Sequence, residues 1–107
     1  MDTSYEISKS AEKDWRSIVE YTYINFGKRQ VEKYTKRLLK CLDDLTKDVG
    51  HKKEIDVSGH QVILKHCQKH YIFGLQRNDK PLLIIAILHE QMDLIQRLKN
   101  RLNKSII

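Results

Sequence analysis

Three residues near the middle of the chain could ligate a metal ion: His66, Cys67 and His70. On one extended strand His66 and His70 would lie about 13 Å apart, too far to share a zinc ion whose ligands bind at about 2 Å. A turn at residues 68–69 would fold the segment back and make such a site possible. Ordinary strand and turn histidines are the simpler interpretation. We therefore expect neither a metal nor a cofactor.

Cationic side chains are concentrated near the C-terminus. After Asp93, the chain carries Arg97, Lys99, Arg101 and Lys104 with no further acidic residue. Arg97 and Arg101 are four residues apart and would share one helix face, with Lys104 about one turn further on. Such a surface favours an acidic partner, either nucleic acid or an acidic protein. The alternative is a solvated face that only keeps the protein soluble.

His89, Met92 and Asp93 lie between a long apolar run and the last predicted helix. A carboxylate at residue 93 could accept hydrogen bonds from the free N–H groups at that helix start, or from His89. Because each of these bonds is local and common, we interpret the three residues as a structural corner rather than as a contact with a target.

Apolar periodicity indicates the elements that position these residues. Alternation at residues 5–8 predicts a short strand. Apolar residues at helical spacing then predict one helix capped by Ser10 and a second from about residue 28 to 48. Gly27 would separate them, and so short a connection makes the two an antiparallel αα-hairpin.

The second half has the pattern of strands. Further strands are expected at residues 62–64, 71–75 and 82–88, and Ile55 and Val57 could add a brief extended segment. The last run lacks alternation, which predicts a central strand buried on both faces. A final helix would begin near Met92. This order predicts a two-layer α+β domain, in which the N-terminal strand and αα-hairpin pack on one face of a mainly antiparallel sheet of about four strands, with a C-terminal helix.

Length and composition limit the class of protein. The 107 residues fit one domain, spanning 1–107, and 32% charged residues of both signs argue against disorder. No apolar run approaches the ~18 residues that cross a bilayer, and no secretory signal is visible. Cys41 and Cys67 lie outside any C-x-x-C spacing, so we expect reduced thiols in a cytoplasmic protein.

The net charge of +6 is unevenly distributed. Residues 1–50 carry ten Lys or Arg against nine Asp or Glu, whereas residues 51–107 carry ten against five. The basic character therefore belongs mainly to the second half of the chain.

Two stretches resemble the ParE branch of the RelE/ParE toxin superfamily. The first consists of Tyr5-Glu6-Ile7-Ser8, Ala11, Asp14-Trp15, Ile18, Tyr21-Thr22 and Phe26-Gly27, with Gln30, Tyr34 and Leu38 beyond. The second and more specific stretch is His70-Tyr71-Ile72-Phe73 followed by Ile85 to Leu94, which contains the pattern ILHxxMD. Arg97-Leu98 and Arg101-Leu102 continue the match. The resemblance covers nearly the whole chain except residues 49–60.

This resemblance implies a RelE/ParE-like fold and a toxin that blocks DNA gyrase on cleaved DNA, so that replication stalls. It also implies neutralisation by a ParD-like antitoxin, a toxin–antitoxin hetero-oligomer, and stabilisation of a plasmid or chromosomal segment. Under this hypothesis Arg97, Arg101 and Lys104 form the target-binding surface, because arginine is favoured in binding anchors.

The antitoxin would bind to surplus apolar positions on the αα-hairpin. Tyr21, Tyr23 and Ile24 lie off the core face of the first predicted helix, and Leu39 flanks that of the second. A tail that orders on binding could use these side chains through helix-in-groove or strand-addition contacts. The alternative is that a wide helix face buries them.

The competing function is enzymatic, because RelE-type relatives cut mRNA on the ribosome. That chemistry needs an acid, a base and cations within hydrogen-bond reach, and Lys65, His66, Arg77 and His89 are the candidates here. Ala86 stands where a catalytic cation would be wanted, and no tyrosine follows His89. We therefore expect no catalytic site; Lys65, Arg77 and His89 would carry the alternative.

Overall fold

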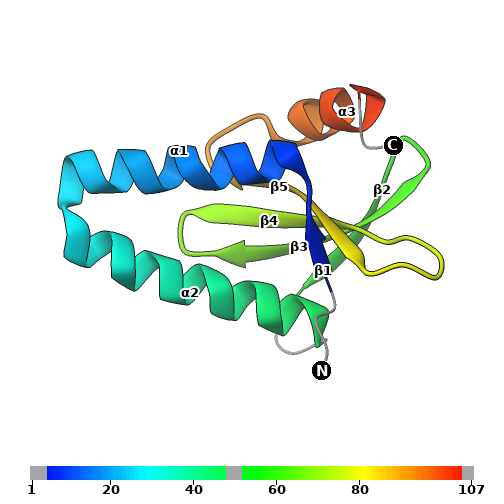
Figure 1. Ribbon diagram of the computed structural model, residues 1–107. Helices are drawn as coiled ribbons and strands as arrows, with labels where there is room; N and C mark the ends of the chain where they lie inside the picture. The colour runs from blue at the N-terminus through cyan, green and yellow to red at the C-terminus, as the bar shows by residue number, and fades with distance from the viewer. Residues whose placement is uncertain (1–4, 48–51, 105–107) are drawn as a thin grey trace.

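The computed structural model describes residues 5–47 and 52–104 as one α+β unit (Figure 1). Its elements in chain order are β1 (Tyr5–Ile7), α1 (Lys9–Phe26), α2 (Lys28–Thr46), β2 (Lys53–Val57), β3 (His60–Cys67), β4 (His70–Leu75), β5 (Leu82–His89) and α3 (Leu94–Lys104). The expected fold class is confirmed. The end predicted for the second helix, near residue 48, falls outside the described residues.

The sheet has five strands in the order β1-β5-β4-β3-β2, one strand more than expected because residues 53–57 join it fully. β1 runs parallel to β5, with Tyr5 opposite Leu82, and the other pairs are antiparallel. The expected burial of β5 on both faces is confirmed, since residues 83–88 are all buried.

A register shift within β5 helps to explain its missing alternation. Phe73 of β4 lies opposite Ala86, but the next residue, Gly74, lies opposite Ile84. Ile85 therefore has no opposite residue on β4, and the inward and outward positions change phase there. As a result Ile85 and Ala86 both belong to the core cluster beside α3.

The αα-hairpin forms as predicted, with one difference at its start. The side chain of Ser8, not Ser10, caps α1, because its hydroxyl accepts a hydrogen bond from the N–H of Ala11 at 3.1 Å. Gly27 ends α1 with φ of 88°, a conformation that a side chain would disfavour. The hairpin projects beyond the ends of β3, β4 and β5 (Figure 1).

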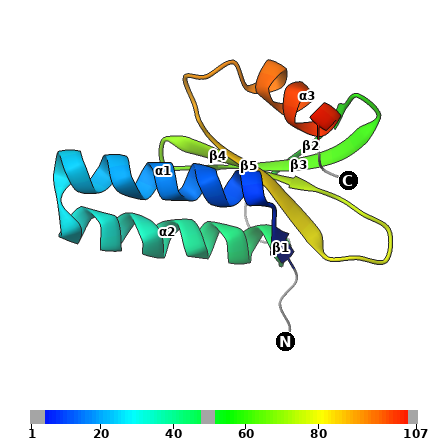
Figure 2. The same ribbon diagram turned by 45° about the horizontal axis from the view of Figure 1, so that its top comes forward.

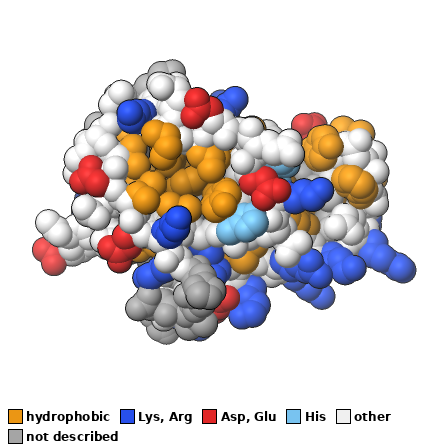
Figure 3. Space-filling view, turned by 180° about the vertical axis from the view of Figure 1, so that it is seen from behind, with side chains coloured by type: hydrophobic (Ala, Val, Ile, Leu, Met, Phe, Trp, Pro, Cys, Tyr) orange, Lys and Arg blue, Asp and Glu red, His pale blue; other side chains and the backbone are white. Residues whose placement is uncertain are grey.

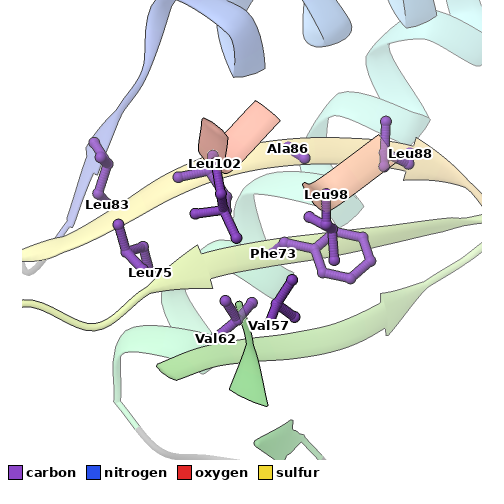
Figure 4. Packing of buried hydrophobic residues seen from close by; sticks show 10 residues of the cluster. Val57, Val62, Phe73, Leu75, Leu83, Ala86, Leu88, Leu98 and Leu102 are labelled. Atoms are coloured by element: carbon purple, nitrogen blue, oxygen red, sulfur yellow. The ribbon is translucent and has the colours of Figure 1, made fainter. Parts of the chain in front are cut away.

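The three helices do not share one face of the sheet. α1 and α2 cover one face, where Ala11, Leu38 and Leu42 pack with Ile72 and Ile84. α3 covers the other face and contributes Leu98 and Leu102 to the second cluster, as Figures 2 and 4 show. Since β5 is apolar on both sides, each face requires a cover of its own.

Part of the face beneath α3 is not fully covered. Ile55, Leu64, Tyr71 and Leu94 are only partly buried there. Seen from behind, apolar side chains gather in one patch with charged side chains around it (Figure 3). None of the helices in the described segments is long and apolar enough to cross a membrane.

Cys41 and Cys67 form a disulfide, so the expectation of two reduced thiols is wrong. Packing of α2 against β3 brings their Cα atoms to 6.3 Å, within the range that a disulfide spans. The sequence separation of 26 residues gave no sign of this proximity.

Candidate partner-binding surfaces

A groove opens where the hairpin projects past the strand ends, and we call it the overhang groove. Its volume is about 620 Å³, and its walls come from α1, α2, the β3–β4 turn and the segment after β5. The lining residues are Ser17, Ile18, Tyr21, Thr22, Phe26, Gln30, Tyr34, Gln68, Lys69, His70, His89 and Met92. Its size is typical of a site that binds part of a ligand or partner.

Tyr34 and His70 lie side by side in this groove. The Tyr34 hydroxyl lies 2.6 Å from Nδ1 of His70 in a hydrogen bond between α2 and β4. Burial raises the pKa of Tyr34 to about 12. Burial, with a smaller repulsion from His89, lowers the pKa of His70 to about 4. Both groups are therefore neutral at pH 7, and their hydrogen bond fixes the first residue of β4 against α2.

His89 stands beside this pair at the end of β5. Its ring centroid lies 5.2 Å from that of His70, in an edge-on arrangement. The Nδ1 atom of His89 accepts a hydrogen bond from the N–H of Gln91 at 3.1 Å, and its carbonyl accepts one from Met92 at 3.0 Å. These local bonds turn the chain away from the sheet.

Asp93 accepts a side-chain hydrogen bond from the start of α3 rather than from His89. Its Oδ1 atom accepts a hydrogen bond from the N–H of Gln96 at 3.3 Å, and its carbonyl accepts one from Arg97 at 3.1 Å. The carboxylate thus satisfies one of the free N–H groups at the helix end. The sequence suggested two partners for Asp93, the free N–H groups of the helix start and His89. In the structure the Asp93 carboxylate bonds to the helix start.

Arg101 makes internal contacts that the sequence did not indicate. Its Nη1 atom lies 2.6 Å from Oδ2 of Asp14 and donates to the carbonyl of Ile85 at 3.0 Å. Asp14 also accepts a hydrogen bond from the N–H of Ile87 at 2.9 Å. The carboxylate of Asp14 therefore connects α1, β5 and α3. Sequence reasoning missed its role, although Asp14 belongs to the amino-terminal stretch that resembles ParE.

Arg97 and Lys104 are the other two residues of the predicted target-binding surface. Arg97 is exposed on α3, as is its neighbour Lys99. Lys104 is the last residue of α3, but its side chain lies outside the described part of the chain. Among the α3 cations whose side chains the structure describes, Arg97 and Lys99 are thus exposed, whereas Arg101 faces inward.

The four predicted antitoxin contacts are all exposed, so the hairpin does not bury them as a wide helix face would. Tyr21, Tyr23 and Ile24 are exposed by 64%, 60% and 73%, and Leu39 by 48%. They do not form one surface, however. Tyr21 lines the overhang groove next to Phe26, with ring centroids 6.5 Å apart.

Leu39 lines a second groove of about 450 Å³, which we call the outer groove. Ile7, Glu12, Trp15, Arg16 and Leu42 complete its walls. Tyr23 and Ile24 are not among the lining residues of either groove. The hairpin therefore offers apolar side chains in two places.

Among the residues of the ribonuclease alternative, Arg77 lies far from His89. Arg77 donates to Glu6 at 2.7 Å and to the carbonyl of Pro81, beside the start of β5. His89 ends that same strand, so an eight-residue strand of roughly 25 Å separates the two. Lys65 lies on β3 opposite Ile72.

The candidate metal ligands also point in different directions, although the predicted turn at residues 68–69 is present. His66 bonds to Glu90 at 2.8 Å, Cys67 is in the disulfide and His70 bonds to Tyr34. Within residues 5–47 and 52–104, no group of three or more His, Cys, Asp or Glu side chains could hold a metal ion.

Comparison with known proteins agrees with the resemblance. Residues 5–94 match the family model described as the ParE toxin of the type II toxin–antitoxin system parDE. The chain is also similar to Toxin ParE of Escherichia coli, with 37% identity over 100 residues that cover 94% of this chain and 97% of that relative.

Proposed function

Because the chain belongs to the ParE toxin family of type II toxin–antitoxin systems, we propose that it inhibits DNA gyrase and that a ParD-like antitoxin neutralises it. In this proposal the toxin acts in the cytoplasm by binding rather than by catalysis. The pair forms a hetero-oligomer and stabilises the plasmid or chromosomal segment that encodes it.

One observation carries the antitoxin half of this proposal: the tip of the αα-hairpin is apolar and exposed. Four large apolar side chains lie within six residues there, namely Tyr21, Tyr23, Ile24 and Phe26. Several large apolar side chains exposed at one end of a small domain are typical of surface that a partner covers. An antitoxin tail that orders on the hairpin fits this surface.

The target half is supported by α3. Arg97 and Lys99 are exposed on a helix with no acidic residue in its first turn, and gyrase bound to DNA presents much negative charge. Arg101 supports the same surface indirectly, since its bond to Asp14 fixes the helix that carries Arg97.

The alternative, cleavage of mRNA, is separated from gyrase inhibition by one induction experiment. The chain is expressed briefly in growing bacteria, and plasmid topology and message integrity are measured in the same samples. Linear plasmid DNA with intact mRNA is expected. Codon-proximal mRNA cuts with unchanged plasmid topology would reject gyrase as the target and favour a ribonuclease.

A matched test uses purified gyrase and relaxed plasmid. The folded chain should block supercoiling and leave cleaved DNA after protein digestion, and the co-purified antitoxin should restore supercoiling. Undiminished supercoiling at a large molar excess of the chain would reject the proposal.

A further inference from the structure

The overhang groove is the place on the hairpin where apolar surface and cationic groups meet. Tyr21, Phe26 and Met92 line it and are exposed by 64%, 66% and 40%. They come from α1 and from the segment before α3, which are far apart in sequence. Covering all three with one partner segment removes apolar surface from water, which favours binding.

The charge of this groove favours a partner segment that carries acidic side chains. None of its twelve lining residues is Asp or Glu, whereas one of them, Lys69, is cationic. At its rim, exposed Arg37 donates to the side chain of Gln68 at 3.0 Å. A segment that carries carboxylates beside its apolar side chains therefore meets complementary charge here.

The outer groove lacks this selectivity. It contains Glu12 next to Arg16, so its charge is mixed. Of the two grooves, only the overhang groove combines exposed aromatic rings with cationic and no anionic lining.

Three links hold the walls of the overhang groove in place. The Tyr34–His70 hydrogen bond and the Arg37–Gln68 hydrogen bond join α2 to the β3–β4 hairpin. The Cys41–Cys67 disulfide joins the same two elements just before the turn. A wall that is already ordered loses less conformational entropy when a partner binds.

We propose that the overhang groove binds a short acidic segment of the antitoxin, an inference that rests on the proposed function. The apolar side chains of this segment pack on Tyr21, Phe26 and Met92. The same segment covers His89 and Met92, so the antitoxin occupies the corner that precedes the cationic helix α3. Neutralisation then includes direct covering of this corner and not only a contact on the hairpin's outer side.

A single-stranded nucleic acid is the other class of ligand with negative charge. The groove fits it less well, because the rings of Tyr21 and Phe26 meet at 66° and offer no pair of parallel faces for a base. Lys69 is the one lysine among the lining residues, whereas strand-binding grooves line the backbone with several cations.

The test compares charged substitutions inside and outside the groove. Met92→Glu is matched by Ile95→Glu, because both side chains are exposed apolar groups close together near the start of α3 and only Met92 lines the groove. Lys69→Glu is matched by Lys80→Glu, an exposed lysine in the turn before β5. Circular dichroism melting first establishes that each variant is folded, and Phe26→Glu replaces any that is not.

Binding of each variant to the purified antitoxin encoded beside the toxin gene is measured by calorimetry. We expect Kd to rise at least about tenfold for Met92→Glu and Lys69→Glu, the size of effect seen at interface anchors. The two controls should change it less than about twofold. Equal binding by all four variants would overturn the groove assignment while leaving the proposed function intact.

Two further outcomes are decisive. If the wild-type chain does not bind this antitoxin at all, the proposed function and the groove assignment both fail. If groove variants bind antitoxin normally but lose binding to a fluorescein-labelled single-stranded oligonucleotide, the groove belongs to nucleic acid and our inference is wrong.

Discussion

Asp14 and Arg101 are 87 residues apart in the chain, yet their side chains form an ion pair at 2.6 Å between α1 and α3. The two side chains are exposed by only 16% and 20%. Backbone groups of β5 complete the arrangement, because Ile87 donates to Asp14 and Ile85 accepts from Arg101. Helices on opposite faces of the sheet are thus joined through β5, which lies between β1 and β4.

Replacing Asp14 with Asn should therefore destabilise the whole domain. The guanidinium of Arg101 would remain partly buried without its counter-charge, and breaking such a pair costs up to 3–5 kcal/mol when it is fully buried. Since this pair is partly exposed, we expect about 2 kcal/mol, measured as the free energy of unfolding in urea. Glu12→Gln, an exposed change on the same helix, is the control and should stay within about 0.5 kcal/mol of wild type. Equal stability of the two variants would contradict the structural role of Asp14.

Arg97 and Arg101 should give opposite phenotypes although they lie one turn apart. Arg97→Glu changes an exposed residue, so we expect unchanged unfolding in urea but at least about tenfold weaker inhibition of gyrase supercoiling. Arg101→Met should instead lower the unfolding free energy, because it leaves the partly buried carboxylate of Asp14 without its counter-charge. Full inhibition by folded Arg97→Glu would remove α3 from the target-binding surface.

Local patterns in the sequence predicted most of the elements. The αα-hairpin, the break at Gly27 and the buried β5 all follow from spacing over a few residues, and these predictions are confirmed. The cap was placed at Ser10 because the helical apolar pattern begins there. The Ser8 hydroxyl reaches the N–H of Ala11 instead, so the helix starts earlier.

Contacts between distant segments were not predictable from the sequence. The parallel pairing of β1 with β5, the Asp14–Arg101 pair and the Cys41–Cys67 disulfide each join residues at least 26 positions apart. Arg101 was assigned to the target because the sequence shows its charge but does not show that Asp14 lies beside it in the fold. For the same reason the exposed apolar residues of the hairpin could be named, but the placement of Tyr21 in one groove and of Leu39 in another could not.

The Cys41–Cys67 disulfide should stabilise the fold and make its stability sensitive to reductants. Closing a loop of about 26 residues lowers the entropy of the unfolded chain, which corresponds to about 3.5 kcal/mol in the loop-entropy treatment. The melting temperature of the wild type should fall when dithiothreitol is added. Cys41→Ala should melt at the lower temperature with or without the reductant. If dithiothreitol lowers both melting temperatures equally, the disulfide is not the cause.

Stability should also fall at mildly acidic pH because of His70. Burial lowers its pKa to about 4 in the folded protein, whereas the unfolded chain has the ordinary value near 6.5. Below pH 6.5 the unfolded chain binds a proton that the folded protein does not. Stability present above pH 6.5 is therefore lost progressively as pH falls toward 4.

The measurement is urea unfolding at intervals between pH 7 and 4.5, for wild type and His70→Gln. Carboxylates also begin to titrate at the lower end, so the informative quantity is the difference in slope between the two proteins. His70→Gln should be less stable at pH 7, since it loses the bond to Tyr34, and should lose less on acidification. His60→Gln, an exposed change in β3, should keep the wild-type slope. Parallel curves for wild type and His70→Gln would mean that His70 is not the group that titrates.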